Sequence, residues 1–144
     1  MDHVHSLALQ LFIGSVIIIL TIICHAVFAV AAEWVLQREH LWPGRRAGTF
    51  KFLIYLVGMT LWLLLSMSVN VWLWAVLMLW LDIFHELETA VYFSLVSFTT
   101  LGFGDIILMR EWRILSGLMA ANGLIIFGLT TAVLIDFLTR LRRA

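Results

Sequence analysis

The chain has 144 residues, a length that suits one compact unit and leaves no room for a second domain of ordinary size. Hydrophobic residues make up 63% and charged residues 12%, whereas soluble domains are about 25% charged; this chain could not cover a water-exposed surface and must lie mostly in lipid. Its nine basic and nine acidic residues cancel, so net charge gives no reason to expect a nucleic-acid partner.

The first predicted membrane span covers Leu7–Ala32, which contains no formally charged residue. It exceeds the roughly 20 apolar residues that a helix needs to cross a bilayer core. The N-terminus before it lacks the basic patch of a secretory signal, so we expect this helix to be retained. The next segment, Glu33–Lys51, carries four basic residues and the chain's only proline. It is predicted to be a basic loop.

Two further spans are predicted on either side of a more polar segment. Phe52–Leu81 is uncharged and long enough to cross the bilayer with tilt or protrusion. Charges return between Asp82 and Arg113, and the apolar stretch within that segment is too short to span. Ile114–Ile135 is uncharged again. It predicts the third span, within an inner helix over 114–138.

The distribution of basic residues predicts the orientation in the membrane. The basic stretches at 38–51 and 140–143 should both face the cytoplasm. Three spans then place the N-terminus outside and the C-terminus in the cytoplasm of a multi-pass cell-membrane protein. Residues 82–113 would return to the outer side as a re-entrant hairpin, which is tolerated only where it is buried in protein or lines water.

The hairpin contains two glycines, Gly102 and Gly104, followed directly by Asp105. Rings of backbone carbonyls can replace the water shell of a dehydrated cation. Successive carbonyls point the same way only where left- and right-handed backbone alternate, and glycine tolerates this at little steric cost. Leu101 and Phe103 would then point away from the axis that runs through the carbonyl rings, and would pack against the preceding short helix.

That short helix is predicted from about Glu88 to Thr99. Its C-terminal end carries a partial negative charge and would point toward the centre of the ion pore that the carbonyl rings would line. Thr100 can add its hydroxyl oxygen below the carbonyl rings. Asp105 would concentrate cations at the outer mouth.

The run Thr99-Thr100-Leu101-Gly102-Phe103-Gly104-Asp105 resembles the TTVGYGD signature of the tetrameric potassium channels. Around it, the helix–hairpin–helix from Phe52 to Arg143 resembles the complete two-helix pore module. The resemblance implies a homotetramer in membrane lipid, with K⁺ as the permeating ion and no other cofactor. It implies K⁺ coordination at Thr100, Leu101, Gly102 and Phe103, with Gly104 completing the filter. Leu101 replaces the usual valine and Phe103 the usual tyrosine.

The run from Gly123 to Ala132 is similar to the inner helix of simple bacterial potassium channels. That likeness implies that Gly123 is the gating hinge, although close helix packing is the alternative role for a small residue. It also implies that Leu124, Phe127 and Thr131 line the cavity below the filter, and their spacing puts them on one helix face.

Tyr92 lies eight residues before Thr100. Relatives often carry an aromatic donor at this position that steadies the filter aspartate. The resemblance therefore predicts a Tyr92–Asp105 hydrogen bond that supports the mouth of the filter.

Several other polar residues have a structural interpretation beside a functional one. We expect His25 to be a hydrogen-bonded packing residue rather than a pH sensor. Asp136 is expected to pair with Arg140 at i+4, and Asn70 to hydrogen-bond between helices. A separate acidic cluster is either a cation-attracting vestibule or a set of solvated charges. Its members are Asp82, Glu86 and Glu88.

These predictions define an all-α membrane protein with three transmembrane helices, a re-entrant pore helix and a filter loop, assembled as a tetramer. Residues 1–51 would supply an extra N-terminal transmembrane helix, expected to brace the outer helix, and the basic cytoplasmic loop. Residues 52–144 would supply the potassium channel pore module. Its expected parts are an outer helix at 52–81, a pore helix at 88–99, a filter at 100–105 and an inner helix at 114–138.

The predicted function is passive, selective conduction of K⁺. A weakly selective cation channel and a non-conducting membrane interaction subunit are the alternatives. No nucleophile–base pairing or phosphate-cradling loop occurs in the sequence, so an enzyme is not expected. A single cysteine, Cys24, excludes an intrachain disulfide, and the scattered histidines lack metal-ligand spacing.

Overall fold

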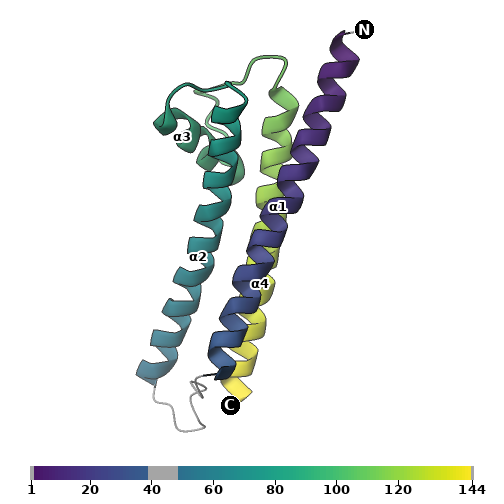
Figure 1. The fold of residues 1–144 in the computed structure, drawn as a ribbon. Helices are drawn as coiled ribbons and strands as arrows, with labels where there is room; N and C mark the ends of the chain where they lie inside the picture. The colour runs from purple at the N-terminus through teal and green to yellow at the C-terminus, as the bar shows by residue number, and fades with distance from the viewer. Residues whose placement is uncertain (1, 39–48, 144) are drawn as a thin grey trace.

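The computed structural model describes residues 2–38 and 49–143, with side chains described over 7–34 and 50–140. These residues form four helices and no strand. Three helices are long, α1 (Asp2–Arg38), α2 (Thr49–Trp80) and α4 (Arg113–Arg143), and α3 (Leu87–Phe98) is short (Figure 1). Most of the predicted basic loop, including its arginines at 45 and 46, lies outside the described residues.

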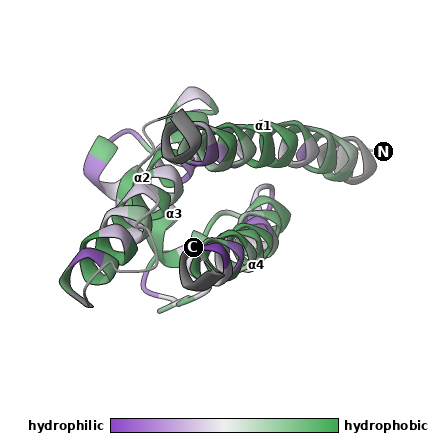
Figure 2. Ribbon diagram, turned by 90° about the horizontal axis from the view of Figure 1, so that it is seen from below, coloured by the Kyte–Doolittle hydropathy of each residue, from purple (hydrophilic) through white to green (hydrophobic). Residues whose placement is uncertain are grey.

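Each long helix contains a segment that is long and apolar enough to cross a membrane. These segments are Leu7–Trp34, Phe50–Trp80 and Arg113–Arg140, whereas α3 is too short. Seen along the bundle, the three long ribbons are predominantly hydrophobic (Figure 2). The predicted all-α membrane fold is therefore confirmed, together with its three possible spans.

The helices extend beyond the apolar segments from which they were predicted. α1 runs from residue 2 to 38 around the predicted span 7–32, and α4 continues to residue 143 beyond the predicted end at 138. Charge ends an apolar segment but does not end a helix, because long basic side chains reach out to the membrane surface. Hydropathy therefore marks the membrane-embedded part of each helix and not its ends.

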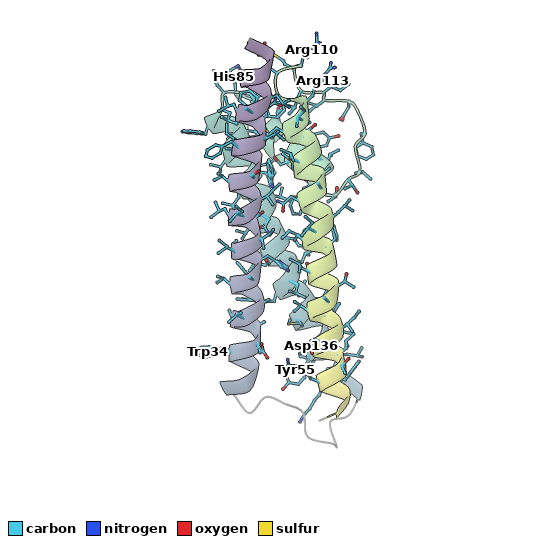
Figure 3. The ribbon with its side chains drawn as sticks, turned by 90° about the vertical axis from the view of Figure 1, so that its right-hand side faces the viewer. Trp34, Tyr55, His85, Arg110, Arg113 and Asp136 are labelled. Carbon is cyan, nitrogen blue, oxygen red and sulfur yellow. The ribbon has the colours of Figure 1, made fainter. Side chains whose placement is uncertain are left out.

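The three long helices lie side by side, and α3 folds back near the end that holds the N-terminus of α1 (Figure 1). α1 and α4 run in the same direction, and α2 runs opposite to both. His85, Arg110 and Arg113 lie at one end of the bundle, and Trp34 and Asp136 at the other (Figure 3). α1 contacts both α2 and α4, so it braces the inner helix as well as the outer helix.

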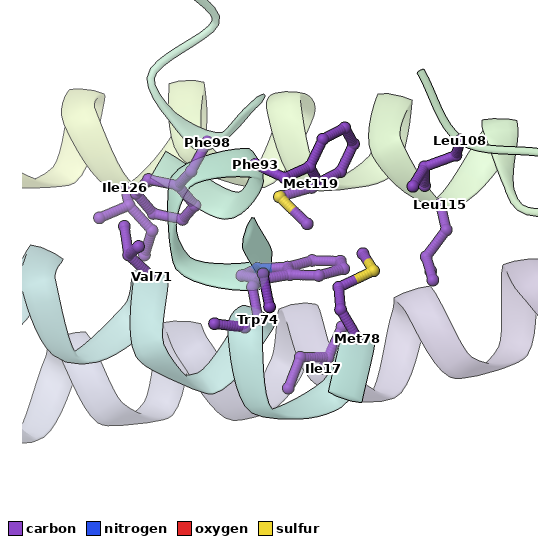
Figure 4. Close-up of a cluster of buried hydrophobic side chains, with 12 residues drawn as sticks. Ile17, Val71, Trp74, Met78, Phe93, Phe98, Leu108, Leu115, Met119 and Ile126 are labelled. Atoms are coloured by element: carbon purple, nitrogen blue, oxygen red, sulfur yellow. The ribbon is translucent and has the colours of Figure 1, made fainter. Parts of the chain in front are cut away.

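The main core joins all four helices around Trp74, which is fully buried (Figure 4). Ile17 of α1, Phe98 of α3 and Met119 of α4 belong to the same cluster. Lipid tails are as apolar as these side chains, so van der Waals packing rather than expulsion of water holds such a core together in a membrane. This packing fixes α3 against α2 and α4, and thereby positions the segment that follows α3.

Candidate functional site

The segment after α3 is anchored on the carbonyl groups at the C-terminal end of that helix. The N–H of Thr99 donates to the Leu95 carbonyl at 3.0 Å. The N–H groups of Leu101 and Gly102 both donate to the Val96 carbonyl, at 3.0 and 3.2 Å. Carbonyls in the last turn of a helix have no partner within the helix. The beginning of the predicted filter therefore supplies them with donors.

These two hydrogen bonds also set the direction of the carbonyl groups. Peptide groups are planar, and no cis peptide bond occurs in the described part of the chain. In a trans peptide the carbonyl points opposite to the N–H. Because the N–H groups of Leu101 and Gly102 both point toward Val96, the carbonyl oxygens of Thr100 and Leu101 both point away from α3. Two successive carbonyls thus face the same side.

Left-handed backbone alternates along the same segment. The φ angles are +60° at Thr100, +54° at Gly102 and +76° at Gly104. The sequence predicts left-handed backbone at the two glycines but not at Thr100, where a side chain makes it cost roughly 1–2 kcal/mol. A Cβ at either glycine would meet no atom within 4 Å. The backbone conformation, and not a lack of space, therefore favours glycine at these positions.

The predicted hydrogen bond between Tyr92 and Asp105 is present. Tyr92 Oη donates to Asp105 Oδ2 at 2.6 Å, and the Ile106 N–H donates to Asp105 Oδ1 at 3.1 Å. The bond from Tyr92 is the main cause that lowers the pKa of the Asp105 carboxyl, and it raises the pKa of the Tyr92 hydroxyl. Asp105 therefore carries a full negative charge at neutral pH.

The expected packing of Leu101 and Phe103 against the preceding helix is wrong for the single chain. Their side chains are 58% and 65% exposed. Val96 and Phe98, the apolar side chains at that end of α3, are already buried. The same chain therefore leaves the two filter side chains on its outer surface.

Gly123 lies in close contact with the end of α3. A Cβ added there would clash with the Phe98 carbonyl oxygen, so the close-packing role holds at this position. Three neighbouring α4 residues, Leu124, Phe127 and Thr131, are exposed in the single chain. They share one face of α4, and the Thr131 hydroxyl donates to the Phe127 carbonyl of its own helix at 2.9 Å.

The structure places the membrane-embedded charged and imidazole groups as follows. Asp136 Oδ2 pairs with Arg140 Nε at 2.8 Å, as predicted, and Glu33 Oε1 of α1 contacts Arg140 Nη1 at 2.7 Å. His25 is 1% exposed, and its Nδ1 lies 2.9 Å from Ser66 Oγ of α2. It is therefore hydrogen-bonded, as expected. The Glu33–Arg140 pair joins α1 to α4, and no pattern in the sequence predicts this pair.

Asn70 differs from expectation. Its side chain is fully buried, but neither amide atom has a hydrogen-bond partner within the described residues. The expected interhelical hydrogen bond is therefore absent within the described residues.

The outer acidic residues are exposed. Asp82 pairs with His85 at 3.1 Å, with side chains 84% and 79% exposed. Glu86 Oε2 accepts a bond from the Thr89 hydroxyl at 3.4 Å. Glu88, in the first turn of α3, suits the positive end of that helix. The exposure of these side chains is compatible with both interpretations of the cluster, a set of solvated charges or a cation-attracting vestibule.

No group of three or more histidine, cysteine, aspartate or glutamate side chains that could hold a metal ion occurs among the side chains that the structure describes. The candidate site described above consists of backbone carbonyls, with the Asp105 carboxylate at its edge.

Comparison with known families gives one match. A family model described as an ion channel matches residues 52–140. The match covers most of α2, all of α3, the filter segment and most of α4, and it begins after α1. No curated protein and no solved structure matches the chain.

Proposed function

Because the chain belongs to this ion channel family, we propose that it is one subunit of a homotetrameric, potassium-selective channel of the cell membrane. The observation that carries the proposal is the pair of hydrogen bonds from Leu101 and Gly102 to the Val96 carbonyl. They turn consecutive filter carbonyls away from α3, as a carbonyl-lined filter needs. One chain supplies a quarter of the pore.

In the proposed mechanism, carbonyl oxygens of Thr100 to Phe103 from four subunits replace the water around a dehydrated K⁺ ion. The Thr100 hydroxyl adds a further oxygen at the inner end. Repulsion between neighbouring ions then favours exit. Ions move through the filter down their electrochemical gradient, so conduction is passive.

Charges around the filter favour cations in this arrangement. The C-terminal end of α3 carries a partial negative charge next to the filter. Asp105, whose lowered pKa keeps it ionised, would raise the local cation concentration at the mouth. Leu124, Phe127 and Thr131 would line the water-filled cavity below.

Exposure of the filter side chains supports assembly from several copies. Leu101 and Phe103 are largely exposed on one chain, and exposed apolar side chains beside a polar ion path are unfavourable. A neighbouring subunit in a fourfold ring would cover them. This surface is therefore the proposed subunit contact.

The proposed orientation puts the N-terminus outside and the C-terminus in the cytoplasm. α3 and the filter lie toward the bundle end that holds the N-terminus of α1 (Figure 1), which would be the outer end. The basic residues at 140–143 would face the cytoplasm.

One observation favours a weakly selective cation channel as the second candidate. Phe103 lacks the hydroxyl group through which the usual tyrosine would attach the filter to its surroundings. In the single chain the Phe103 side chain is also largely exposed. A more loosely held filter could lose part of its preference for K⁺.

Purified protein in a planar bilayer, with KCl on one side and NaCl on the other, tests the proposal. With the two salts at equal concentration, potassium selectivity predicts a reversal potential far from zero, with the NaCl side positive. A reversal potential near zero would favour the weakly selective channel. Absence of any cation current from correctly assembled protein would favour a non-conducting interaction subunit.

A further inference from the structure

The chain contains two asparagines, Asn70 in α2 and Asn122 in α4, and both are fully buried within membrane-spanning helices. Asn122 Nδ2 donates to Thr21 Oγ1 of α1 at 2.8 Å, but Asn122 Oδ1 has no partner within the described residues. Both amide atoms of Asn70 and the indole Nε1 of Trp74 also lack a hydrogen-bond partner within the described residues. Unpaired amide groups are costly in a membrane interior.

Helix register brings these groups together. α1 and α2 are antiparallel, because His25 contacts Ser66 and the Trp62 indole donates to the Phe28 carbonyl. One turn from His25 leads back to Thr21, and one turn from Ser66 leads on to Asn70, on the same helix faces. Thr21 and Asn70 are therefore level with each other.

Asn122 completes the group, because it is bonded to Thr21. Trp74 lies one further turn along the same face of α2 as Asn70. The register thus places Asn70 and Asn122 at one level where α1, α2 and α4 meet, with Trp74 one turn further along α2.

Protein groups do not satisfy these atoms. Asn70 and Asn122 are 0% exposed within a single chain, so neither lipid nor a neighbouring subunit can reach them. The Thr21 hydroxyl already donates to the Ile18 carbonyl at 2.8 Å, and its one proton is therefore not free for Asn70.

We infer that ordered water binds at this junction and bridges the Asn70 amide to Asn122 Oδ1 and Trp74 Nε1. Water both donates and accepts, and buried water typically makes two to four such bonds. A metal ion does not suit the site, because its described groups are neutral and include two N–H donors. The site lies within the span and is separate from the ion path through the filter.

The bound water has a positioning role. Asn122 directly precedes Gly123, which lies against the Phe98 carbonyl at the base of the filter segment. Water that links α2 to Asn122, together with the direct bond from Asn122 to Thr21 of α1, therefore holds α4 at the level where it supports α3. This inference rests on the packing within one chain and does not depend on potassium selectivity.

Selective labelling of asparagine with ¹⁵N tests the inference, because only two side-chain NH₂ groups become visible. In lipid nanodiscs, NMR should show contacts between slowly exchanging water and the side-chain NH₂ groups of both Asn70 and Asn122. An Asn70 NH₂ group without a water contact, or one bonded directly to Asn122 Oδ1, would overturn the inference.

Two variants test the bridge itself. Asn122→Leu and Trp74→Phe should each weaken the water contact of Asn70 at least several-fold. Trp74→Phe keeps an aromatic ring and guards against a misfolded Asn122 variant. Thr60→Val is the matched control, since the Thr60 hydroxyl bonds only to Leu56 of its own helix. An Asn70 water contact that is unchanged in Trp74→Phe would show that the water does not bridge these groups.

Discussion

The backbone of α4 at Gly123 lies against the carbonyl oxygen of Phe98, so closely that a Cβ at Gly123 would clash with it. Phe98 is the last residue of α3, and the filter segment begins two residues later. Glycine at this point therefore lets α4 reach the base of the filter. A hinge at the same residue stays a prediction.

Replacing Gly123 with alanine should destabilise the protein, because a backbone carbonyl cannot move aside as a flexible side chain can. Overpacking typically costs about 1–3 kcal/mol. Thermal unfolding in detergent measures the effect. Gly128→Ala is the control, since nothing lies within 4 Å of its added Cβ, and alanine there gains up to about 1 kcal/mol in helix propensity. Equal stability of the two variants would contradict the close contact.

Tyr92→Phe should raise the pKa of Asp105, because the hydrogen bond from Tyr92 is the main cause of its lowered value. A lowered pKa in the folded state stabilises the fold above the ordinary pKa of aspartate, and this contribution disappears as pH falls through the folded pKa. The raised pKa of Tyr92 acts in the opposite direction, so its contribution is lost as pH rises through its folded pKa.

An NMR titration of ¹³C-labelled aspartate would follow the Asp105 carboxyl in the wild type and in Tyr92→Phe. Tyr55→Phe is the matched control, because Tyr55 is the chain's only other tyrosine and lies at the far end of the bundle (Figure 3). An Asp105 midpoint that does not move in Tyr92→Phe would show that the bond does not hold in the membrane.

Much of the fold follows from the sequence, since uncharged segments determine the three spans. The polar contacts between α1 and α4 did not follow from the sequence. Glu33 and Arg140 are separated by 107 positions, and a polar residue in an apolar helix does not indicate which neighbour it faces. The filter glycines were predictable from their backbone requirement. Left-handed Thr100 was not, because a β-branched side chain normally disfavours that conformation.

Loss of the Glu33 carboxylate should loosen the C-terminal end of α1. Glu33→Gln removes the negative charge that pairs with Arg140, whose side chain is 46% exposed, so we expect a loss of less than about 1 kcal/mol. Hydrogen exchange should rise at the C-terminal end of α1. Asp136→Asn is the control, because its pair with Arg140 lies within α4. A similar rise in exchange in both variants would argue against a cross-helix role.

Gly102→Ala should disturb the filter through its backbone alone. No atom lies within 4 Å of the added Cβ, but φ is +54°, which costs an L-residue roughly 1–2 kcal/mol. We expect the segment to relax toward right-handed backbone and the preference for K⁺ over Na⁺ to fall at least tenfold in bilayer recordings. Gly58→Ala, with an equally open site in α2, should conduct normally. Unchanged selectivity in Gly102→Ala would mean that this conformation is not needed.

A density map of the purified assembly in K⁺ tests the central claim most directly. It should show four copies around one axis, with a line of ion density between the carbonyl oxygens of residues 100 to 103. Carbonyls that point away from the centre, or an assembly without a central axis, would contradict potassium conduction by this protein.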